Sequence, residues 1–444
     1  MKAFSIKINK KIKKFSNVIK VDGDKSISHR FFLIASQAYG ISEAKGILCS
    51  EDIINTVNSL KKLGVKIFKK KDIYFVHGYG LGSYVVKKNL TINCGNSGTL
   101  ARLIVGLLSS YPNKIKITGD KSLKKRPMSR IIFPLKKFGM NFSPKNKLNL
   151  PLSVCGSEIP MNIYHEEKIG SAQVKSSIIL ASLNTPGITK IKEVRPSRNH
   201  TENMLKYAGA DISIKKKNNH NIISVNGLND YKSFKIEIPG DISSAAFFIV
   251  LTLLNNKSKI LIRNVNLNPT RMGIIKILKK MKANIKITKV KNMYGEITGD
   301  LIVKSSKLKA ISCPKNLVPS AIDEFPILMV AACRAKGITS FSGLKELNKK
   351  ESPRLNLMNK IFKKIGIKSK LVGDSIKIKG EPNMFLKKSF KINTMYDHRI
   401  AMSVFCIAQI FGGSFTISDC HSINTSFPHF LKLMKSIGAK YEIK

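Results

Sequence analysis

Residues 23–30 read Gly-Asp-Lys-Ser-Ile-Ser-His-Arg, and the apolar run Phe31-Phe-Leu-Ile34 follows them directly. Asp24 is a favourable N-cap residue, so this stretch predicts a helix that begins near Lys25. The first turn of a helix has free backbone N–H groups and the positive end of the helix dipole. Because a lysine, two serines and an arginine lie beside that turn, the stretch predicts an anion-binding site.

The same pattern, a small polar cluster that opens an apolar helix, recurs along the chain. A second marker, a helix end at which lysines precede a small residue, recurs in phase with it. Two markers in phase predict six units of about 70–80 residues, each with two helices and three or four strands. The polar clusters lie at Asp24, Asn96, Ser171, Asp241, Ser320 and Asp397, and the helix ends lie at Gly64, Gly139, Gly209, Ala283, Gly366 and Gly438.

A near-copy of residues 23–26 occurs at residues 240–243, where the chain reads Gly-Asp-Ile-Ser. This copy divides the six units into two halves of three. We therefore expect an α/β protein with two lobes of similar build. Several helix N-termini would then face a cleft between the lobes and make it rich in anion-binding groups.

The composition excludes several classes of protein. The chain has 444 residues, and its longest apolar runs, such as residues 245–254, are far shorter than the ~20 residues of a membrane span. Its seven cysteines form no Cys-x-x-Cys pair, which argues against a zinc site or a disulfide framework and favours reduced thiols. We expect a soluble, cytoplasmic protein with no metal and no membrane partner.

The formal net charge of +51 raises the question of a nucleic-acid partner. Of the 78 basic residues only 11 are arginine, and the 67 lysines are scattered along the whole chain. This distribution indicates a general enrichment in lysine, so we expect no specific nucleic-acid binding, although weak binding at low salt is expected. The planar guanidinium of arginine can donate two parallel hydrogen bonds to one carboxylate or phosphate, and the ammonium group of lysine cannot. The first candidates for substrate contacts are therefore Arg30, Arg102, Arg126, Arg198, Arg354 and Arg399.

Eight short motifs span nearly the whole chain, and together they are very specific. They are residues 23–30, Gly95-Asn-Ser-Gly-Thr-Leu-Ala-Arg102, Arg126-Pro-Met-Ser-Arg130, Gly170-Ser-Ala-Gln-Val-Lys-Ser176, Ser197-Arg-Asn-His-Thr-Glu202, Ile322-Asp-Glu324, Lys350-Glu-Ser-Pro-Arg354 and Asp397-His-Arg-Ile-Ala-Met402. In content and order they resemble the 5-enolpyruvylshikimate-3-phosphate synthases, a family of enolpyruvyl transferases.

The resemblance implies a two-lobed fold with three βαβαββ units in each lobe. One lobe would comprise residues 21–235, the other would comprise residues 1–20 and 236–444, and the active site would lie in the cleft between them. The implied reaction transfers the carboxyvinyl group of phosphoenolpyruvate to the 5-hydroxyl of shikimate 3-phosphate and releases phosphate, as a step of chorismate and aromatic amino acid biosynthesis. The resemblance implies no cofactor, and we expect a monomer.

The resemblance also assigns roles to individual residues. For catalysis, Asp323 is the candidate base at the 5-hydroxyl, Glu351 is the candidate proton donor to C3 of phosphoenolpyruvate, and Lys25 can take part in proton transfer. The residues implied to bind shikimate 3-phosphate are Lys25, Ser26, Arg30, Ser171, Ala172, Gln173, Arg198, Asp323 and Lys350. Those implied to bind phosphoenolpyruvate are Lys25, Gly98, Arg126, Gln173, Arg354 and Arg399.

Simpler interpretations of these residues stay open at this point. Asp323 and Asp397 could be helix N-caps alone, and Lys350 and Glu351 could be a solvated run of charge. Three positions also depart from the family pattern, and the first is Asp22, which stands where many members have a proline. Pro353 removes an N–H and a carboxylate from its motif and restricts Ser352. Thr425 stands where some members have a lysine that contacts phosphate.

Three other functions compete with this assignment. A UDP-N-acetylglucosamine enolpyruvyl transferase would have the same fold, but residues 119–128 lack the cysteine on which that family usually relies. A catalytically inactive relative would bind anions without turnover. An RNA-binding protein would bind RNA tightly and selectively at physiological salt.

Overall fold

The computed structural model describes residues 4–218 and 220–444. Residues 1–3 and 219, which the sequence-based lobe boundaries include, lie outside the described residues. The chain divides into two compact units, each with its own hydrophobic core. Unit 1 comprises Met1–Asp22, Pro239–Asn292 and Ile297–Lys444, and unit 2 comprises Gly23–Ile238 and Met293–Glu296.

The short segment Met293–Glu296 lies in a different unit from the one expected, since the sequence-based boundary placed it with residues 236–444. It is the turn between two long strands, and it packs on unit 2. Glu296 Oε1 lies 2.8 Å from His200 Nδ1, and both side chains are buried. A hairpin tip cannot be assigned from the chain order alone, because its partner is nearly 100 residues away in the sequence.

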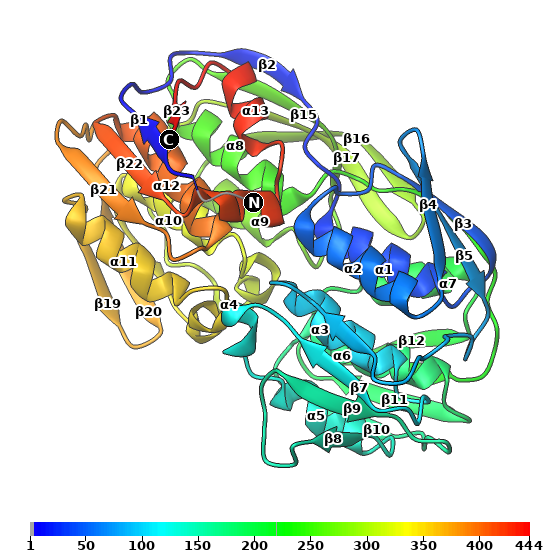
Figure 1. The fold of residues 1–444 in the computed structure, drawn as a ribbon. Coiled ribbons are helices and arrows are strands. Elements are labelled where there is room, and N and C mark those ends of the chain that lie inside the picture. Colours follow the sequence, from blue (N-terminus) through cyan, green and yellow to red (C-terminus); the bar gives the residue numbers. More distant parts are fainter. Residues whose placement is uncertain (1–3, 219) are drawn as a thin grey trace. The chain divides into compact units, whose positions relative to one another are not determined.

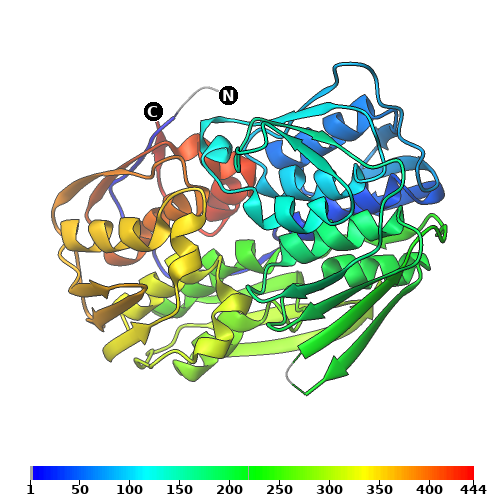
Figure 2. The same cartoon turned by 90° about the horizontal axis from the view of Figure 1, so that it is seen from below.

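Unit 2 contains three four-stranded sheets among its described residues, and all three have the same plan (Figures 1 and 2). In each, the first two strands are parallel and the other neighbours are antiparallel. The strand orders are β14 (Lys235–Glu237), β3 (Tyr39–Lys45), β5 (Ile73–Tyr79), β4 (Lys66–Lys70); β6 (Thr91–Asn93), β7 (Ile115–Thr118), β9 (Leu152–Cys155), β8 (Asn141–Ser143); and β10 (Tyr164–Glu167), β11 (Ile188–Glu193), β13 (His220–Asn226), β12 (Ile212–Lys217).

Unit 1 repeats this arrangement in three further sheets within the described part of the chain. The sheet that contains residues 337–341 has only three strands. Where the other sheets have a fourth strand, Lys309 and Ser312 make isolated parallel bridges to Lys336 and Ser340. The strand orders are β2 (Ser16–Ile19), β15 (Lys259–Asn266), β17 (Glu296–Lys304), β16 (Asn284–Met293); β18 (Gly337–Phe341), β20 (Ser375–Gly380), β19 (Ser369–Val372); and β21 (Ser389–Asn393), β22 (Ser414–Ser418), β1 (Ile6–Ile8), β23 (Glu442–Ile443).

The helices that open with the predicted polar clusters form the centre of each unit. In unit 1, α8 (Ile242–Leu254), α10 (Phe325–Cys333) and α12 (His398–Phe411) pack against one another (Figure 1). Every residue of α8 and α10 is buried, as expected for helices that are apolar on all sides. In unit 2, α3 (Gly98–Leu107) packs against both α1 (Lys25–Ala35) and α6 (Ala172–Leu183).

The contact between α3 and α6 requires a glycine. A Cβ at Gly106 would lie 2.2 Å from the carbonyl oxygen of Ser177, so any larger residue would separate the two helices. Ser177 Oγ in turn donates to Arg102 O (2.9 Å). This close approach fixes the spacing of two helices that both begin at predicted substrate-binding residues.

The remaining helices carry the second repeated marker. Glycines with a left-handed φ of 83° to 95° follow five of them, at Gly64, Gly139, Gly209, Gly366 and Gly438. In the fourth unit, where Ala283 stands, Lys282 adopts the left-handed conformation instead (φ 69°). These helices are α2 (Glu51–Lys62), α5 (Ser129–Lys136), α7 (His200–Ala208), α9 (Gly273–Lys280), α11 (Arg354–Lys364) and α13 (Phe430–Ser436); α4 (Lys121–Lys124) is a further short helix.

Candidate functional site

Five of the six predicted polar clusters cap a helix with a side chain. Asp24 Oδ1 accepts from Ile27 N (3.0 Å) at the start of α1, and Ser171, Asp241 and Asp397 do the same for α6, α8 and α12. At α3 the cap is Ser97, which follows Asn96 in the polar cluster. The first turn of each helix has backbone N–H groups that make no hydrogen bond within the helix, and anion binding at these starts stays a prediction.

The fifth cluster, residues 319–324, makes no side-chain cap hydrogen bond to its helix. Ser320 lies in a short 3₁₀ helix, Pro319–Ala321, and α10 begins only at Phe325 with Glu324 in the N-cap position. Pro326 is consistent with this start, because proline has no N–H and is best tolerated in the first turn of a helix. The cluster at residues 319–324 therefore directly precedes an apolar helix, as the sequence predicts, and its last residue holds the N-cap position.

The start of α1 places Lys25 and Arg30 in different surroundings. Lys25 Nζ forms an ion pair with Asp52, which lies on α2. Arg30 is buried, and its guanidinium donates to Thr201 Oγ1 (2.7 Å), Ser176 Oγ (2.9 Å) and Ser26 O (3.0 Å). Burial lowers the pKa of Arg30 to about 10, although Glu202 acts in the opposite direction. A buried cation that donates to neutral oxygens is well suited to an added anion.

A second group of cations surrounds the start of α3. Arg126 donates to Asn96 Oδ1 (2.7 Å), and Arg102 donates to Gly98 O (3.1 Å). A Cβ at Gly98 would lie 2.7 Å from Arg102 Nη1 and 3.2 Å from Arg126 Nη1. Gly98 therefore lets two guanidinium groups approach a helix N-terminus closely, which concentrates positive charge there.

The start of α6 carries three of the predicted contacts. Ser171 caps the helix through its hydroxyl, Ala172 is the first helical residue, and Gln173 Nε2 donates to Thr99 Oγ1 (3.2 Å). Arg198 is half-buried and lies in the loop between β11 and α7. In unit 2 the predicted residues thus cluster at the N-termini of three adjacent helices, with Arg198 in the loop before a fourth.

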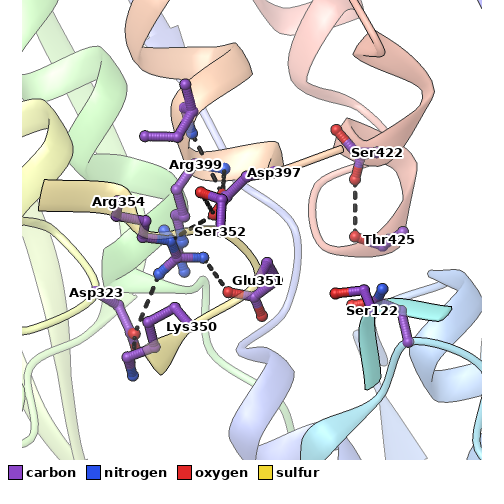
Figure 3. A network of polar contacts seen from close by, with 12 residues as sticks. Ser122, Asp323, Lys350, Glu351, Ser352, Arg354, Asp397, Arg399, Ser422 and Thr425 are labelled. Atoms are coloured by element: carbon purple, nitrogen blue, oxygen red, sulfur yellow. Dashed lines mark hydrogen bonds and ion pairs between the residues drawn. The ribbon is translucent and has the colours of Figure 1, made fainter. Parts of the chain in front are cut away.

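In unit 1 a dense ionic network surrounds Arg354 (Figure 3). Arg354 Nε donates to Asp397 Oδ2 (2.8 Å), its Nη2 pairs with Glu351, and its Nη1 lies 3.6 Å from Asp323 Oδ1. Lys350 Nζ donates to the same Asp323 oxygen (2.9 Å). Burial opposes the charge of Arg354, but Asp397, Glu351 and Asp323 together raise its pKa above the ordinary value. The guanidinium therefore stays charged.

This network decides between the interpretations that the sequence left open. Asp323 is not the N-cap of α10, because Glu324 holds that position. Lys350 and Glu351 are half-buried partners of Asp323 and Arg354, so they are not a solvated run of charge. Asp397 is the N-cap of α12 and also an ion-pair partner of Arg354. Its Oδ1 accepts from Arg399 N (2.9 Å), and its Oδ2 accepts from Arg354 Nε.

The departures at Pro353 and Thr425 are accommodated by local hydrogen bonds. Pro353 occupies the N-cap position of α11, and Ser352 Oγ donates to Asp397 Oδ2 (2.9 Å). Pro353 therefore leaves its neighbour Ser352 in the Arg354 network. Thr425 Oγ1 donates to Ser422 O (2.7 Å), so this hydroxyl serves its own 3₁₀ helix (Figure 3).

Several residues of these networks were missed by the sequence analysis. Asp52 pairs with Lys25, and Arg271 is a buried arginine whose Nη2 donates to Ser243 Oγ (2.6 Å). The carbonyl of Ser243 accepts from Arg399 Nη1 (3.1 Å). The scarcity of arginine could have singled out Arg271, but no motif in the sequence connects Asp52 to Lys25.

No helix in residues 4–218 and 220–444 has the length and apolar character that a membrane crossing requires. The sequence matches the family model of EPSP synthase (3-phosphoshikimate 1-carboxyvinyltransferase) over residues 9–434. The 3-phosphoshikimate 1-carboxyvinyltransferase of Zymomonas mobilis subsp. mobilis is 41% identical over 98% of this chain and 97% of its own. That of Caldicellulosiruptor bescii is 42% identical over 98% of this chain and 100% of its own. The chain belongs to the EPSP synthase family.

Solved structures agree with this membership. The EPSP synthase of Acinetobacter baumannii superimposes with a TM-score of 0.87 at 36% identity, over 99% of this chain and 100% of its own. The enolpyruvyl transferase NikO of Streptomyces tendae has a TM-score of 0.76 at 12% identity and therefore shows only the shared fold. The predicted fold class is confirmed. Carboxyvinyl transfer in the shikimate pathway is the activity of the EPSP synthase family, and the comparisons favour it over UDP-N-acetylglucosamine enolpyruvyl transfer.

Proposed function

We propose that this EPSP synthase binds phosphoenolpyruvate and shikimate 3-phosphate through the cations and helix N-termini described above. Shikimate 3-phosphate would be held by Lys25, Ser26, Arg30, Ser171, Ala172, Gln173, Arg198, Asp323 and Lys350. Phosphoenolpyruvate would be held by Lys25, Gly98, Arg126, Gln173, Arg354 and Arg399. The observation that carries the proposal is the ionic network in which Arg354, Asp323, Glu351 and Lys350 meet.

The proposed chemistry is an addition followed by an elimination. Asp323 removes the proton of the 5-hydroxyl as its oxygen bonds to C2 of phosphoenolpyruvate, and Glu351 donates a proton to C3. The tetrahedral intermediate then loses a proton from C3 to the Glu351 carboxylate and expels phosphate, which regenerates the carbon–carbon double bond. Lys25 and Arg354 would stabilise the negative charge of the phosphate and carboxylate during both steps.

Each of the proposed acid–base groups already contacts a cation. Asp323 accepts from Lys350, and Glu351 pairs with Arg354. When the carboxylate of phosphoenolpyruvate binds Arg354, it competes with Glu351 for the same guanidinium. We propose that this competition frees the Glu351 carboxylate from Arg354, so that it takes up a proton from solvent and then donates that proton to C3.

The test of this function is phosphate release by the purified protein. Release is expected only when phosphoenolpyruvate and shikimate 3-phosphate are both present, because the leaving phosphate departs from an intermediate that contains both. Phosphate release is measured with each substrate alone and with the pair. Binding of both substrates without release would instead indicate an anion-binding relative that has lost its activity.

The glycine at the start of α3 gives a more specific prediction. Gly98→Ala is expected to raise the KM for phosphoenolpyruvate by about tenfold, because the new methyl group displaces Arg102 and Arg126. The KM for shikimate 3-phosphate should change by less than about twofold and serves as the internal control. Equal changes in both constants would mean that Gly98 does not act on the phosphoenolpyruvate site in particular.

We also propose that the enzyme acts in the cytoplasm as a monomer. All seven cysteines are free, and only Cys49 among them is exposed, which is compatible with a reducing compartment. Size-exclusion chromatography with light scattering would test the oligomeric state. An elution mass near 49.4 kDa is expected.

A further inference from the structure

Lys175 belongs to the motif that opens α6, but the proposed mechanism gives it no role. Its side chain is fully buried, and its Nζ lies 2.7 Å from Glu193 Oε1 and 2.7 Å from Glu202 Oε1. The three side chains come from different elements, namely α6, the end of β11 and α7 (Figure 1). A buried lysine is costly unless opposite charges surround it, and here two carboxylates do so.

The pKa shifts support a charged triad. Burial alone would lower the pKa of Lys175, but Glu202 and Glu193 raise it above the ordinary value. Burial would raise the pKa of Glu193, but Lys175 and the hydrogen bonds from Ser197 and Asn221 lower it. Lys175 and Glu193 are therefore both ionised at neutral pH.

Glu193 connects the triad to the loop that carries Arg198. Glu193 Oε1 accepts from Ser197 N (2.8 Å) and Ser197 Oγ (2.7 Å), and its Oε2 accepts from Asn221 Nδ2 (2.9 Å). Ser197 directly precedes Arg198. One carboxylate thus fixes both the backbone and the side chain of the residue before the proposed phosphate-binding arginine.

The same triad lies next to the partners of Arg30. Ser176, which follows Lys175, accepts from Arg30 Nη2, and Thr201, which precedes Glu202, accepts from Arg30 Nε. Ser176 Oγ and Thr201 Oγ1 are 2.7 Å apart. The neighbours of Lys175 and Glu202 therefore hold a second proposed contact to shikimate 3-phosphate.

We propose that Lys175 and Glu193 are positioning residues for the shikimate 3-phosphate site. Lys175 holds Glu193, Glu193 holds Ser197, and Ser197 sets the position of Arg198. Lys175 and Glu193 are both buried, so neither is expected to touch substrate. The substrate contacts would come from the Arg198 loop and the start of α6. The inference rests on the proposed role of Arg198 in binding shikimate 3-phosphate.

The test compares Glu193→Gln with the unchanged enzyme. The variant is expected to raise the KM for shikimate 3-phosphate by about tenfold, because a neutral amide holds Lys175 and Ser197 less firmly. The KM for phosphoenolpyruvate, measured at saturating shikimate 3-phosphate, should stay within about twofold. A structural defect would not separate the two constants in this way.

A second variant covers the case in which Glu193→Gln does not fold. Ser197→Ala keeps the charged triad and removes only one hydrogen bond, and it is expected to raise the same KM by about threefold. Tyr231→Phe is the matched control, because it removes a buried hydrogen bond to Ile34 O (2.8 Å) in the same unit. The Tyr231→Phe variant should leave both KM values unchanged.

Arg198→Ala, measured in parallel, separates the inference from the function on which it rests. If Arg198→Ala leaves the KM for shikimate 3-phosphate unchanged, the proposed role of Arg198 is wrong. If Arg198→Ala raises that KM but Glu193→Gln and Ser197→Ala do not, the positioning role is overturned.

A pH series gives an independent measurement on Glu193. Its carboxylate contacts Lys175 of α6 and accepts hydrogen bonds from Ser197 and Asn221, while Glu202 of α7 contacts the same lysine. Because its pKa is lowered on folding, Glu193 contributes stability above its unfolded pKa of about 4.3 and loses it as the pH falls through the folded value. The stability difference between the enzyme and Glu193→Gln should therefore be constant near neutral pH and shrink below about pH 4. A difference that does not depend on pH in acid would contradict a charged Glu193.

Discussion

Replacing Glu351 with glutamine is expected to lower kcat by about 10²- to 10⁴-fold, the usual contribution of a positioned general acid. Glutamine has nearly the same shape as glutamate and can still accept a hydrogen bond from Arg354, but it cannot donate a proton to C3 of phosphoenolpyruvate. The half-buried position of Glu351 beside Arg354 supports this role. The measurement is steady-state phosphate release with both substrates at saturation.

The matched control is Glu346→Gln. Glu346 lies in the same segment and also pairs with a cation, since Lys349 Nζ is 3.2 Å from its Oε1, but the side chains of Lys349 and Glu346 are 43% and 36% exposed. An exposed ion pair contributes little, so this variant should retain full activity. If Glu351→Gln keeps more than about a tenth of the activity, the proton reaches C3 from another group, and Lys25 becomes the first alternative.

The fold was predictable because its signals are local. A cap residue and the apolar run after it lie within one turn, so Asp24, Asp241 and Asp397 identified three helix starts correctly. The repetition of those signals in phase then gave the number of units. The cluster at residues 319–324 also precedes a helix, and Pro326 in the first turn fits the start of α10 at Phe325.

The networks that hold the proposed site were less predictable, because their members are far apart in the sequence. Lys175 is paired with Glu202 and Glu193, and in a chain so rich in lysine it could not be told from a solvated side chain. Arg271 lies close in space to Ser243 but 28 residues along the chain. Burial distinguishes such residues, and burial becomes visible only in the folded structure.

The contact between Asp397 and Arg354 leads to the largest expected effect on stability. Asp397→Asn should lower the free energy of unfolding by about 3 kcal/mol, because it leaves the buried guanidinium of Arg354 facing a neutral amide. Breaking a buried ion pair usually costs about 3–5 kcal/mol. We expect a loss near the lower end of that range, since Glu351 and Asp323 still lie beside Arg354. Chemical denaturation of the variant and the unchanged protein measures the difference.

Asp120→Asn is the control for helix capping. Asp120 caps α4 through a hydrogen bond from Leu123 N (2.7 Å), as Asp397 caps α12, but its side chain is exposed and has no ion pair with a buried arginine among the contacts of the described residues. The Asp120→Asn variant should lose about 1 kcal/mol at most. Equal losses in the two variants would show that Asp397 acts only as a cap. The Asp397 carboxylate binds the side chain of Arg354 and the backbone N–H of Arg399. If Asp397→Asn loses more stability than Asp120→Asn and also raises the KM for phosphoenolpyruvate by about tenfold or more, this one carboxylate holds both arginines in place for substrate.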